Sequence, residues 1–162
     1  PGQSLLVAIN LQGRWHPPGL NWDAASEADP AALRKALALL PSLAEQGLIQ
    51  AAKDISQAGL AGTLVMMLES GGLGAELNLD DIPRPEQVTT EQWLCAFPSF
   101  GFLMAVDSPD CAEVQQQFTD HGIGCAVAGH FTREPQLIMH YQQQSACYWD
   151  ISKQRLTGMS NH

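Results

Sequence analysis

Short hydrophobic runs separated by polar and glycine-rich segments recur along the chain, and they predict a series of β-strands. Residues 4–11 form a nearly continuous apolar run, which is typical of a strand buried on both faces. Residues 73–79 carry leucine or alanine at every second position and predict a strand with one face in the core. Residues 102–106 predict another buried strand, and residues 48–55 a strand or an extended entry into a turn.

The C-terminal part of the chain predicts further strands. Residues 123–132 and 136–141 flank a short turn at residues 133–135, so we expect them to pair as a β-hairpin. Residues 145–151 predict a last strand.

Helix starts and stops are marked by capping residues, prolines and glycines. Asp29 followed by Pro30 is typical of a helix N-terminus. Pro41 is expected to break or kink this helix, and a short second helix is expected to end at Gly47. Ser108 and the proline after it predict the start of another helix, which ends near residue 122.

Two segments without hydrophobic periodicity predict loops. Residues 13–29 are rich in proline, glycine and asparagine and predict a long loop of the functional or interdomain kind. Its two tryptophans, Trp15 and Trp22, are candidates for covering a domain interface. Residues 81–90 predict a connector, after which Thr90 is expected to cap a short helix.

These elements predict an α/β (α+β) fold, in which one mixed β-sheet carries helices packed on it. Residues 1–28 form a strand and an interdomain-type loop at the entry of the domain, and residues 29–162 form its body. The composition is 45% hydrophobic and 15% charged, which is typical of a globular chain. Because the chain starts at Pro1 and soon enters an apolar run, we expect it to be part of a longer polypeptide.

Charge and cysteine usage narrow the possible partners. The net charge is −9, and the 8 lysines and arginines are scattered, so nucleic-acid binding is not expected. No apolar run approaches the roughly 20 residues that a membrane span needs.

The cysteines, Cys95, Cys111, Cys125 and Cys147, form no C-x-x-C pair. We interpret them as buried, reduced thiols of a cytoplasmic protein, with a disulfide framework as the alternative.

The remaining titratable residues give weaker signals. Glu69 and Glu76 are expected to be solvated or capping residues. The histidines show no spacing typical of a metal site, either with one another or with the cysteines. They are His16, His121, His130, His140 and His162.

The stretch KDISQAGLAG at residues 53–62 is the strongest candidate for chemistry. Ser56 is expected to cap a helix over residues 57–70, leaving backbone N–H groups at its positive end for a phosphate. Asp54 would repel a bare anion, but it suits a Mg²⁺ ion that the phosphate also touches. The alternative is purely structural: Asp54 and Ser56 are ordinary capping residues, and Gly59 and Gly62 let the helix lie close to the sheet.

The longer stretch at residues 54–83, DISQAGLAGTLVMMLESGGLGAELNLDDIP, resembles the C-terminal domains of the AIR synthase superfamily. That superfamily includes aminoimidazole ribonucleotide synthetase, FGAM synthetase, selenophosphate synthetase, thiamine-monophosphate kinase and a hydrogenase-maturation protein. Its glycine-rich turn and the following strand are matched by Asp54, Ile55, Ser56, Gly59, Leu60, Gly62, Gly74, Ala75, Glu76, Leu77, Asp80, Ile82 and Pro83. The segments FPSFGFLMAVDSPD at 97–110 and AGHFT at 128–132 extend the resemblance, which is greatest to the AIR synthase-related proteins of unassigned activity.

The resemblance implies the C-terminal half of an ATP-dependent enzyme that transfers a phosphoryl group to a small, phosphorylated substrate. The partner would be the enzyme's own N-terminal ATP-binding domain, with Mg²⁺ and ATP as cofactors and a homodimer as the assembly. This chain alone would then be inactive. A non-catalytic module that binds a small ligand or docks a partner is the alternative.

The residues that the resemblance assigns to the nucleotide and its phosphates are Asp54, Ser56, Gln57, Ala58, Gly59 and Gly62, with Asp54 also as the Mg²⁺ ligand. Arg14, Lys53 and His130 are candidates for substrate contact; for His130 a hydrogen-bonded histidine at a sheet edge is the alternative, and for Lys53 an ion pair. Gln57, Ala58 and Asn10 depart from the family pattern, where an acid or threonine, a glycine and an aspartate are expected. Asn10 is neutral where an aspartate would carry charge, and Ala58 narrows the backbone freedom of the turn.

Overall fold

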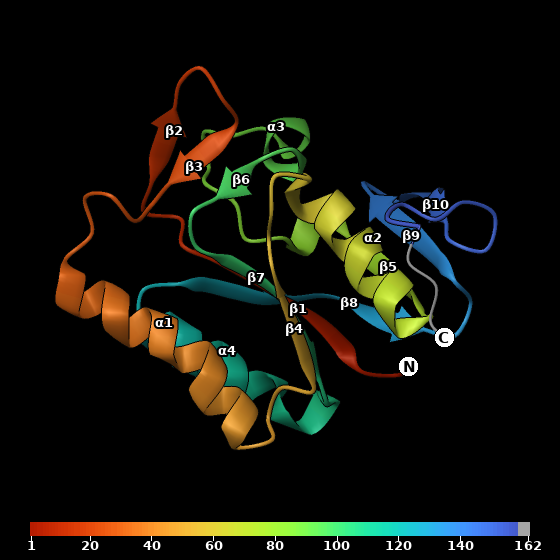
Figure 1. Cartoon of the computed structure of the whole chain (residues 1–162), viewed down its shortest axis with the longest axis horizontal. Coiled ribbons are helices and arrows are strands. Elements are labelled where there is room, and N and C mark those ends of the chain that lie inside the picture. Colours follow the sequence, from red (N-terminus) through yellow and green to blue (C-terminus); the bar gives the residue numbers. More distant parts are fainter. Residues whose placement is uncertain (159–162) are drawn as a thin grey trace.

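Strand β1 (Ser4–Ile9) lies in the middle of a mixed β-sheet in the computed structural model, which describes residues 1–158 (Figure 1). Over these residues the sheet has seven strands in the order β10–β9–β5–β8–β1–β7–β4. The other strands are β4 (Ala51–Asp54), β5 (Gly74–Asn78), β7 (Gly101–Val106), β8 (Gly124–Thr132), β9 (Gln136–Tyr141) and β10 (Gln144–Asp150). The predicted α/β (α+β) class is confirmed.

Helices cover both faces of this sheet, so the molecule has three layers. The helices are α1 (Pro30–Glu45), α2 (Gly59–Gly71), α3 (Thr90–Leu94) and α4 (Cys111–Asp120), with 3₁₀ turns η1 (Leu79–Asp81) and η2 (Ser108–Asp110). On one face α1 and α4 lie side by side, and Leu39 and Phe118 share a core with Leu6 of β1 (Figure 1). On the other face Leu64 of α2 shares a second core with Leu5.

Helix α1 begins as predicted but does not break. The Asp29 carboxylate accepts a hydrogen bond from the Ala32 N–H at 2.8 Å. Pro41 lies inside one continuous helix, so the predicted break and second helix are wrong. Leu39 and Leu43, on either side of the proline, are both buried in the core, and their packing holds the helix together despite the missing N–H.

The C-terminal strands are arranged differently from the prediction. Strand β5 lies between β8 and β9, antiparallel to β8 and parallel to β9. The predicted β8–β9 hairpin is therefore wrong. The hairpin that does form joins β9 to β10, through Gln142 and Gln143, whose φ angles of 46° and 66° are positive. Both positive angles match the type of two-residue turn that suits a twisted hairpin.

The predicted long loop after β1 contains two strands of a small three-stranded sheet, and the third comes from the segment before β7. Its strands are β2 (Arg14–His16), β3 (Asn21–Asp23) and β6 (Phe97–Pro98). Trp22 is buried, and its ring meets those of Trp15 and Trp93 edge-on with centroids 5.4 and 5.3 Å apart. Trp22 thus packs in the chain's own core and is not exposed at a domain interface.

Short turns shift two helix starts from the predicted positions. Thr89, not Thr90, caps α3, because its hydroxyl accepts a hydrogen bond from the Gln92 N–H at 3.3 Å. Ser108 begins η2, and α4 follows it at Cys111.

The four cysteines are free thiols, as expected, but only part of the predicted burial is found. Cys111 is buried, whereas Cys95 and Cys147 are exposed. Burial raises the pKa of the half-buried Cys125 to about 12, so this thiol stays protonated near neutral pH.

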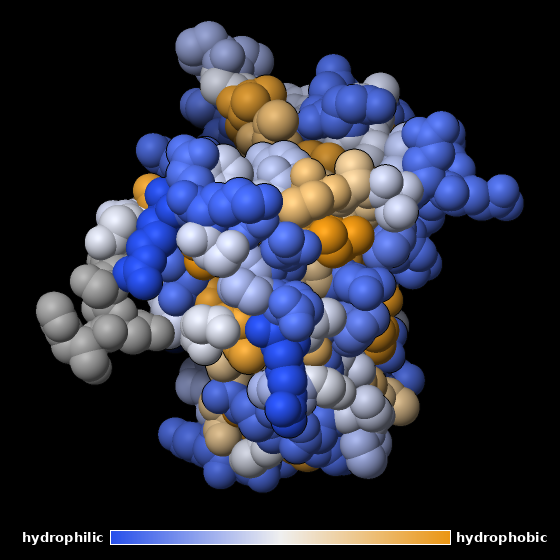
Figure 2. Space-filling model, turned by 90° about the vertical axis from the view of Figure 1, so that its right-hand side faces the viewer, coloured by the Kyte–Doolittle hydropathy of each residue, from blue (hydrophilic) through white to orange (hydrophobic). Residues whose placement is uncertain are grey.

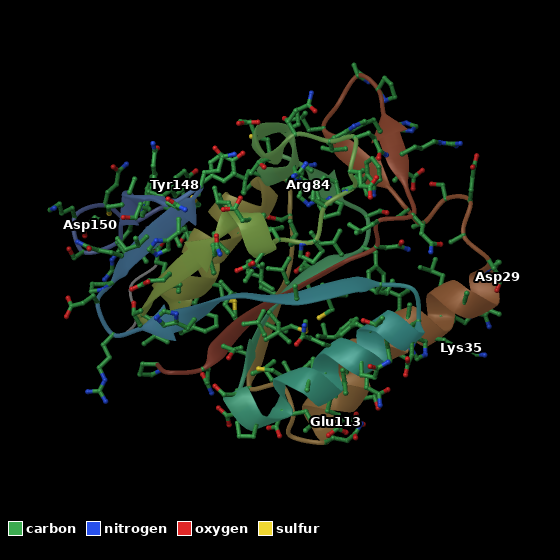
Figure 3. All side chains as sticks on the ribbon, turned by 180° about the vertical axis from the view of Figure 1, so that it is seen from behind. Asp29, Lys35, Arg84, Glu113, Tyr148 and Asp150 are labelled. Atoms are coloured by element: carbon green, nitrogen blue, oxygen red, sulfur yellow. The ribbon has the colours of Figure 1, made fainter. Side chains whose placement is uncertain are left out.

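The surface beside β9 and β10 is mixed in character. Figure 2 shows hydrophobic residues scattered there among hydrophilic ones, not gathered in one continuous area. Tyr148 and Asp150 lie on β10 at one end of the molecule, and Asp29 lies at the other end (Figure 3). No helix of residues 1–158 has the length and apolar character that a membrane crossing requires.

Glu69 of α2 is buried and fastens the C-terminal segment, so its expected exposure is wrong. Its carboxylate accepts hydrogen bonds from the N–H groups of Leu156 at 2.9 Å and Thr157 at 3.0 Å, and from the Thr157 hydroxyl at 2.9 Å. The Thr157 N–H is the largest reason that the pKa of Glu69 lies below its ordinary 4.5.

We expect Glu69→Gln to lower the free energy of unfolding at pH 7. A folded-state pKa below that of the unfolded chain stabilises the fold above pH 4.5, and this contribution is lost as the pH falls through the lower folded value. The difference between the parent chain and Glu69→Gln should therefore shrink below pH 4.5. Urea unfolding at several pH values measures it, with the exposed Glu86→Gln as the matched control. A gap that stays constant through the acid range would contradict this role.

Candidate functional site

Strand β4 carries the first two candidate residues to the edge of the sheet. Lys53 pairs with Leu103 and Asp54 with Phe102 of β7. Residues directly opposite each other share a face of the sheet. Leu103 belongs to the α2-side core and Phe102 packs on the α1–α4 side. Lys53 therefore lies half-buried on the α2 side, and Asp54 is exposed on the opposite side.

The turn after Asp54 is held by a hydroxyl from inside the following helix. The buried Thr63 Oγ1 accepts a hydrogen bond from the Ser56 N–H at 3.0 Å and lies 3.3 Å from the Ser56 hydroxyl. The Gly59 N–H donates to the Ser56 carbonyl at 2.9 Å. Helix α2 starts at Gly59, after Ala58 and without a side-chain cap, so the predicted capping role of Ser56 is wrong.

Both glycines of the turn meet packing requirements. Gly59 has φ of 70°, and a Cβ built on it would lie 2.4 Å from the Leu94 carbonyl oxygen at the end of α3. A Cβ on Gly62 would lie 2.7 Å from the Ala58 Cβ. The methyl group of Ala58 therefore fills the space above Gly62.

The turn still presents an exposed, positively polarised helix end. Gln57 and Ala58 are exposed, and the 13-residue helix α2 directs its first N–H groups toward them. Asp54 is the nearest carboxylate in the sequence. Within residues 1–158 no group of three His, Cys, Asp or Glu side chains could hold a metal ion. A Mg²⁺ ion at Asp54 would need its other oxygens from phosphate and water.

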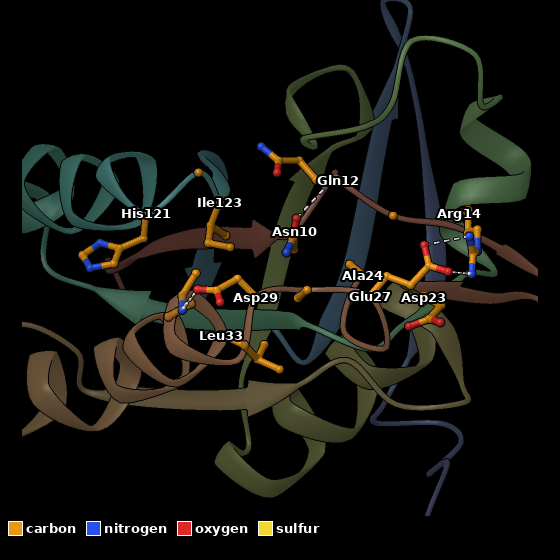
Figure 4. Close-up of a pocket in the computed structure, with 15 residues that line it drawn as sticks. Asn10, Gln12, Arg14, Asp23, Ala24, Glu27, Asp29, Leu33, His121 and Ile123 are labelled. Atoms are coloured by element: carbon orange, nitrogen blue, oxygen red, sulfur yellow. Dashed lines mark hydrogen bonds and ion pairs between the residues drawn. The ribbon is translucent and has the colours of Figure 1, made fainter.

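A cavity of about 510 Å³ opens at the same end of the sheet, between the start of α1, the end of α4 and the loop after β1 (Figure 4). The Asn10 N–H donates to the Phe100 carbonyl at 3.1 Å, and the Ile55 N–H donates to the Gly101 carbonyl at 2.9 Å. Asn10 and Ile55 are thus two strands apart, or about 10 Å. Small and apolar side chains such as Ala32, Ala36 and Leu33 line the cavity together with polar ones.

The cavity rim is mostly acidic. Arg14 forms a bidentate pair with Glu27, one bond of which is 2.9 Å (Figure 4). The Asp23 carboxylate accepts from the Ser26 and Ala25 N–H groups at 3.0 and 3.1 Å, and the Ser26 bond is the main reason its pKa lies below the usual range. Arg14 therefore faces a neutralising carboxylate, and its substrate contact stays a prediction.

Sequence reasoning missed several residues that line this cavity. His121 follows α4, and its Nδ1 lies 2.8 Å from the Gln117 carbonyl oxygen. Glu27 and Asp23 come from the segment predicted as loop. The acidic residues of that segment were the available signal, but nothing in the sequence paired Glu27 with Arg14.

His130 does not join the turn. Register places Asp54 level with Cys125 of β8, three strands away, and His130 lies five residues further along β8. At ordinary strand spacings this separates Asp54 from His130 by about 20 Å. His162 lies outside the described residues.

Comparison with known proteins places this geometry in a family. The family described as AIR synthase related protein, C-terminal domain, matches residues 7–142. An uncharacterized protein of Synechocystis is 36% identical over 160 residues, covering 98% of this chain and 50% of the relative. A PurL subunit of phosphoribosylformylglycinamidine synthase from Halorubrum lacusprofundi is 28% identical over 147 residues, covering 82% of this chain and 19% of the relative.

Solved structures share the fold. Thermotoga maritima PurL complexed with ATP matches with a TM-score of 0.72 and 19% identity, over 90% of this chain and 24% of that one. A HypE–HypF complex matches with a TM-score of 0.67 and 14% identity, over 93% and 53%. The chain spans half the length, or less, of these curated relatives. It therefore belongs to the AIR synthase-related family, as its C-terminal domain.

Proposed function

We propose that this chain is the substrate-side half of an ATP-dependent enzyme that activates a small, phosphorylated substrate by phosphoryl transfer. The observation that carries the proposal is the turn from Asp54 to Ala58, which exposes Asp54, Gln57 and Ala58 and joins a strand end to the N-terminus of α2 within the family-matched segment. The PurL structures complexed with ATP, ADP and FGAR are relatives in fold and support this reaction class.

The chain's own residues would position charge. The backbone N–H groups of the exposed Gln57 and Ala58, at the start of α2, would hold phosphate oxygens, and the Ser56–Thr63 contact would keep the turn rigid. The exposed Asp54 carboxylate fits as a single Mg²⁺ ligand. Mg²⁺ bound there would offset negative charge on the transferred group. Lys53 lies on the face of β4 opposite to Asp54, so its positive charge would act on the phosphate only at longer range.

The rest of the active site would come from outside this chain. An N-terminal domain would supply most of the ATP site, and the assembled enzyme would be a cytoplasmic homodimer. The length of the curated relatives, twice that of this chain, supports a second domain.

A second function, a small-ligand or partner-docking module without ATP chemistry, has its own support. Gly59 is needed for packing against α3, and Ala58 occupies the space above Gly62. Gln57 adds no charge for a metal or a nucleotide. On this alternative the glycines serve the fold alone.

We expect Asp54→Asn to change the binding of two ligands in opposite directions. Loss of the carboxylate removes a Mg²⁺ ligand, so Mg·ATP binding should weaken about tenfold, while removal of a negative charge should strengthen binding of inorganic phosphate. Amide NMR titrations of the chain with each ligand measure both changes, through shifts of residues 53–62.

Asp107→Asn is the matched control. Asp107 is exposed and follows the end of β7, whereas Asp54 pairs near the start of that strand, so this substitution should leave both affinities unchanged. Equal Mg·ATP binding by the parent chain and Asp54→Asn would exclude the metal role. Absence of shifts at the turn with either ligand would favour the docking module.

Packing at the turn gives a test by mutation alone. Gly62→Ala gains helix propensity of about 1 kcal/mol but forces its methyl group against that of Ala58, and we expect a net loss of about 1–2 kcal/mol. Adding Ala58→Gly removes the clash, so the double variant should be at least as stable as the parent. Urea unfolding of the parent, both single variants and the double variant measures the interaction energy between the two positions, which we expect to be about 1–3 kcal/mol. Additive effects of the two substitutions would contradict this contact.

A further inference from the structure

A second cavity of about 510 Å³ lies on the sheet itself, over β5, β8 and β9, away from the turn at Asp54. Glu76 of β5 is directly opposite His130 of β8, and Asn78 of β5 is directly opposite His140 of β9. Because opposite residues share a face, these four side chains lie on one side of the sheet. This is the side of α1 and α4, since His130 also pairs with Ser4, whose neighbour Leu5 points into the α2-side core.

The cavity holds an oriented carboxylate. Glu76 Oε2 lies 3.0 Å from His140 Nε2, and the two side chains are 43% and 38% exposed. A carboxylate oxygen has two lone pairs, so Oε2 can accept a second hydrogen bond beside that of His140. No hydrogen bond from residues 1–158 engages the other oxygen, Oε1. His140 thus fixes the carboxylate while leaving it open to a ligand.

The charge of the lining selects against anions. Within the described chain, Glu76 and Asp80 line the cavity and no lysine or arginine does. Phosphate would therefore meet two carboxylates and no lysine or arginine of the described residues. No group of three His, Cys, Asp or Glu side chains in residues 1–158 could hold a metal ion by itself. The lining therefore favours a neutral or cationic group that donates hydrogen bonds.

An aromatic ring adds shape selection. His130 lies directly opposite Glu76 on the same face of the sheet, and a flat ring of this kind stacks on planar ligand groups. The volume falls within the roughly 300–1,000 Å³ range of small-molecule sites.

We propose that this cavity binds a planar group with two parallel N–H donors, held by both oxygens of Glu76 and flanked by the His130 ring. A carboxylate pairs bidentately with such a group, and His140 acts as the positioning residue. Two chemical sources share this pattern: an amidine or guanidine cation, and the N–H edge of a neutral, amino-substituted purine. The site is separate from the phosphoryl-transfer proposal and does not depend on it.

The test is an NMR titration of the full 162-residue chain, read at the imidazole signals of His130 and His140 and at the amides of β5. Benzamidine probes the cation and guanosine the neutral base. Benzamide and adenosine are the matched controls, since neither carries N–H donors on two nitrogens bonded to the same carbon. We expect saturable shifts with benzamidine, guanosine or both, and none with either control; which probe binds identifies the source.

Variants of the site make the result decisive. Glu76→Gln should weaken binding at least tenfold, whereas Glu86→Gln, an exposed acid outside the cavity, should not change it. His130→Ala removes an exposed side chain and should weaken binding without threatening the fold. Absence of saturable shifts with both probes, or equal binding by the parent and Glu76→Gln, would overturn the proposal.

Discussion

The double burial of strand β1 is the constraint on which the rest of the structure depends. Leu5 and Val7 belong to the α2-side core, and Leu6 and Ala8 belong to the α1–α4 core. Both neighbours of β1 run antiparallel to it. A slip of one residue would exchange these two sets of side chains, so the register is firmly specified. The same register sets where β1 ends, and therefore where Asn10, β7 and the turn after β4 meet.

Local sequence signals were sufficient where the structure is itself local. The apolar run of β1 and the Asp29 cap could be read directly, because periodicity and capping depend on neighbouring residues. The place of β5 between β8 and β9 could not be read in this way. The short turn between β8 and β9 looks like that of a hairpin, and β5, which takes the pairing position, lies about 50 residues earlier in the sequence. Pro41 was misjudged for the related reason that the core contacts of Leu39 and Leu43 outweigh a local penalty.

The candidate turn shows why glycine-rich motifs are ambiguous in a sequence. Family resemblance located the motif, but one glycine in it serves the approach of α3 and the other accommodates Ala58. The capping residue was also misassigned, because Thr63 reaches back to Ser56 from one turn inside the helix. Hydroxyl contacts of this kind leave no sequence pattern of their own. What the turn retains for a ligand is its exposure and the positive end of α2, not the flexibility of its glycines.

Geometry divides the candidate residues between two places. Asp54 and Glu76 lie on strands with three others between them, and β1, buried on both faces, is one of these three. His130, a candidate for substrate contact, lies directly opposite Glu76. A separation of about 20 Å from Asp54 is too long for a single small substrate to bridge. The cavity, lined by Glu76 and Asp80 and by no lysine or arginine of residues 1–158, also opposes the phosphate that the turn would favour. A phosphate-bearing ligand at the turn and an N–H-donating ligand at Glu76 would therefore be two different molecules.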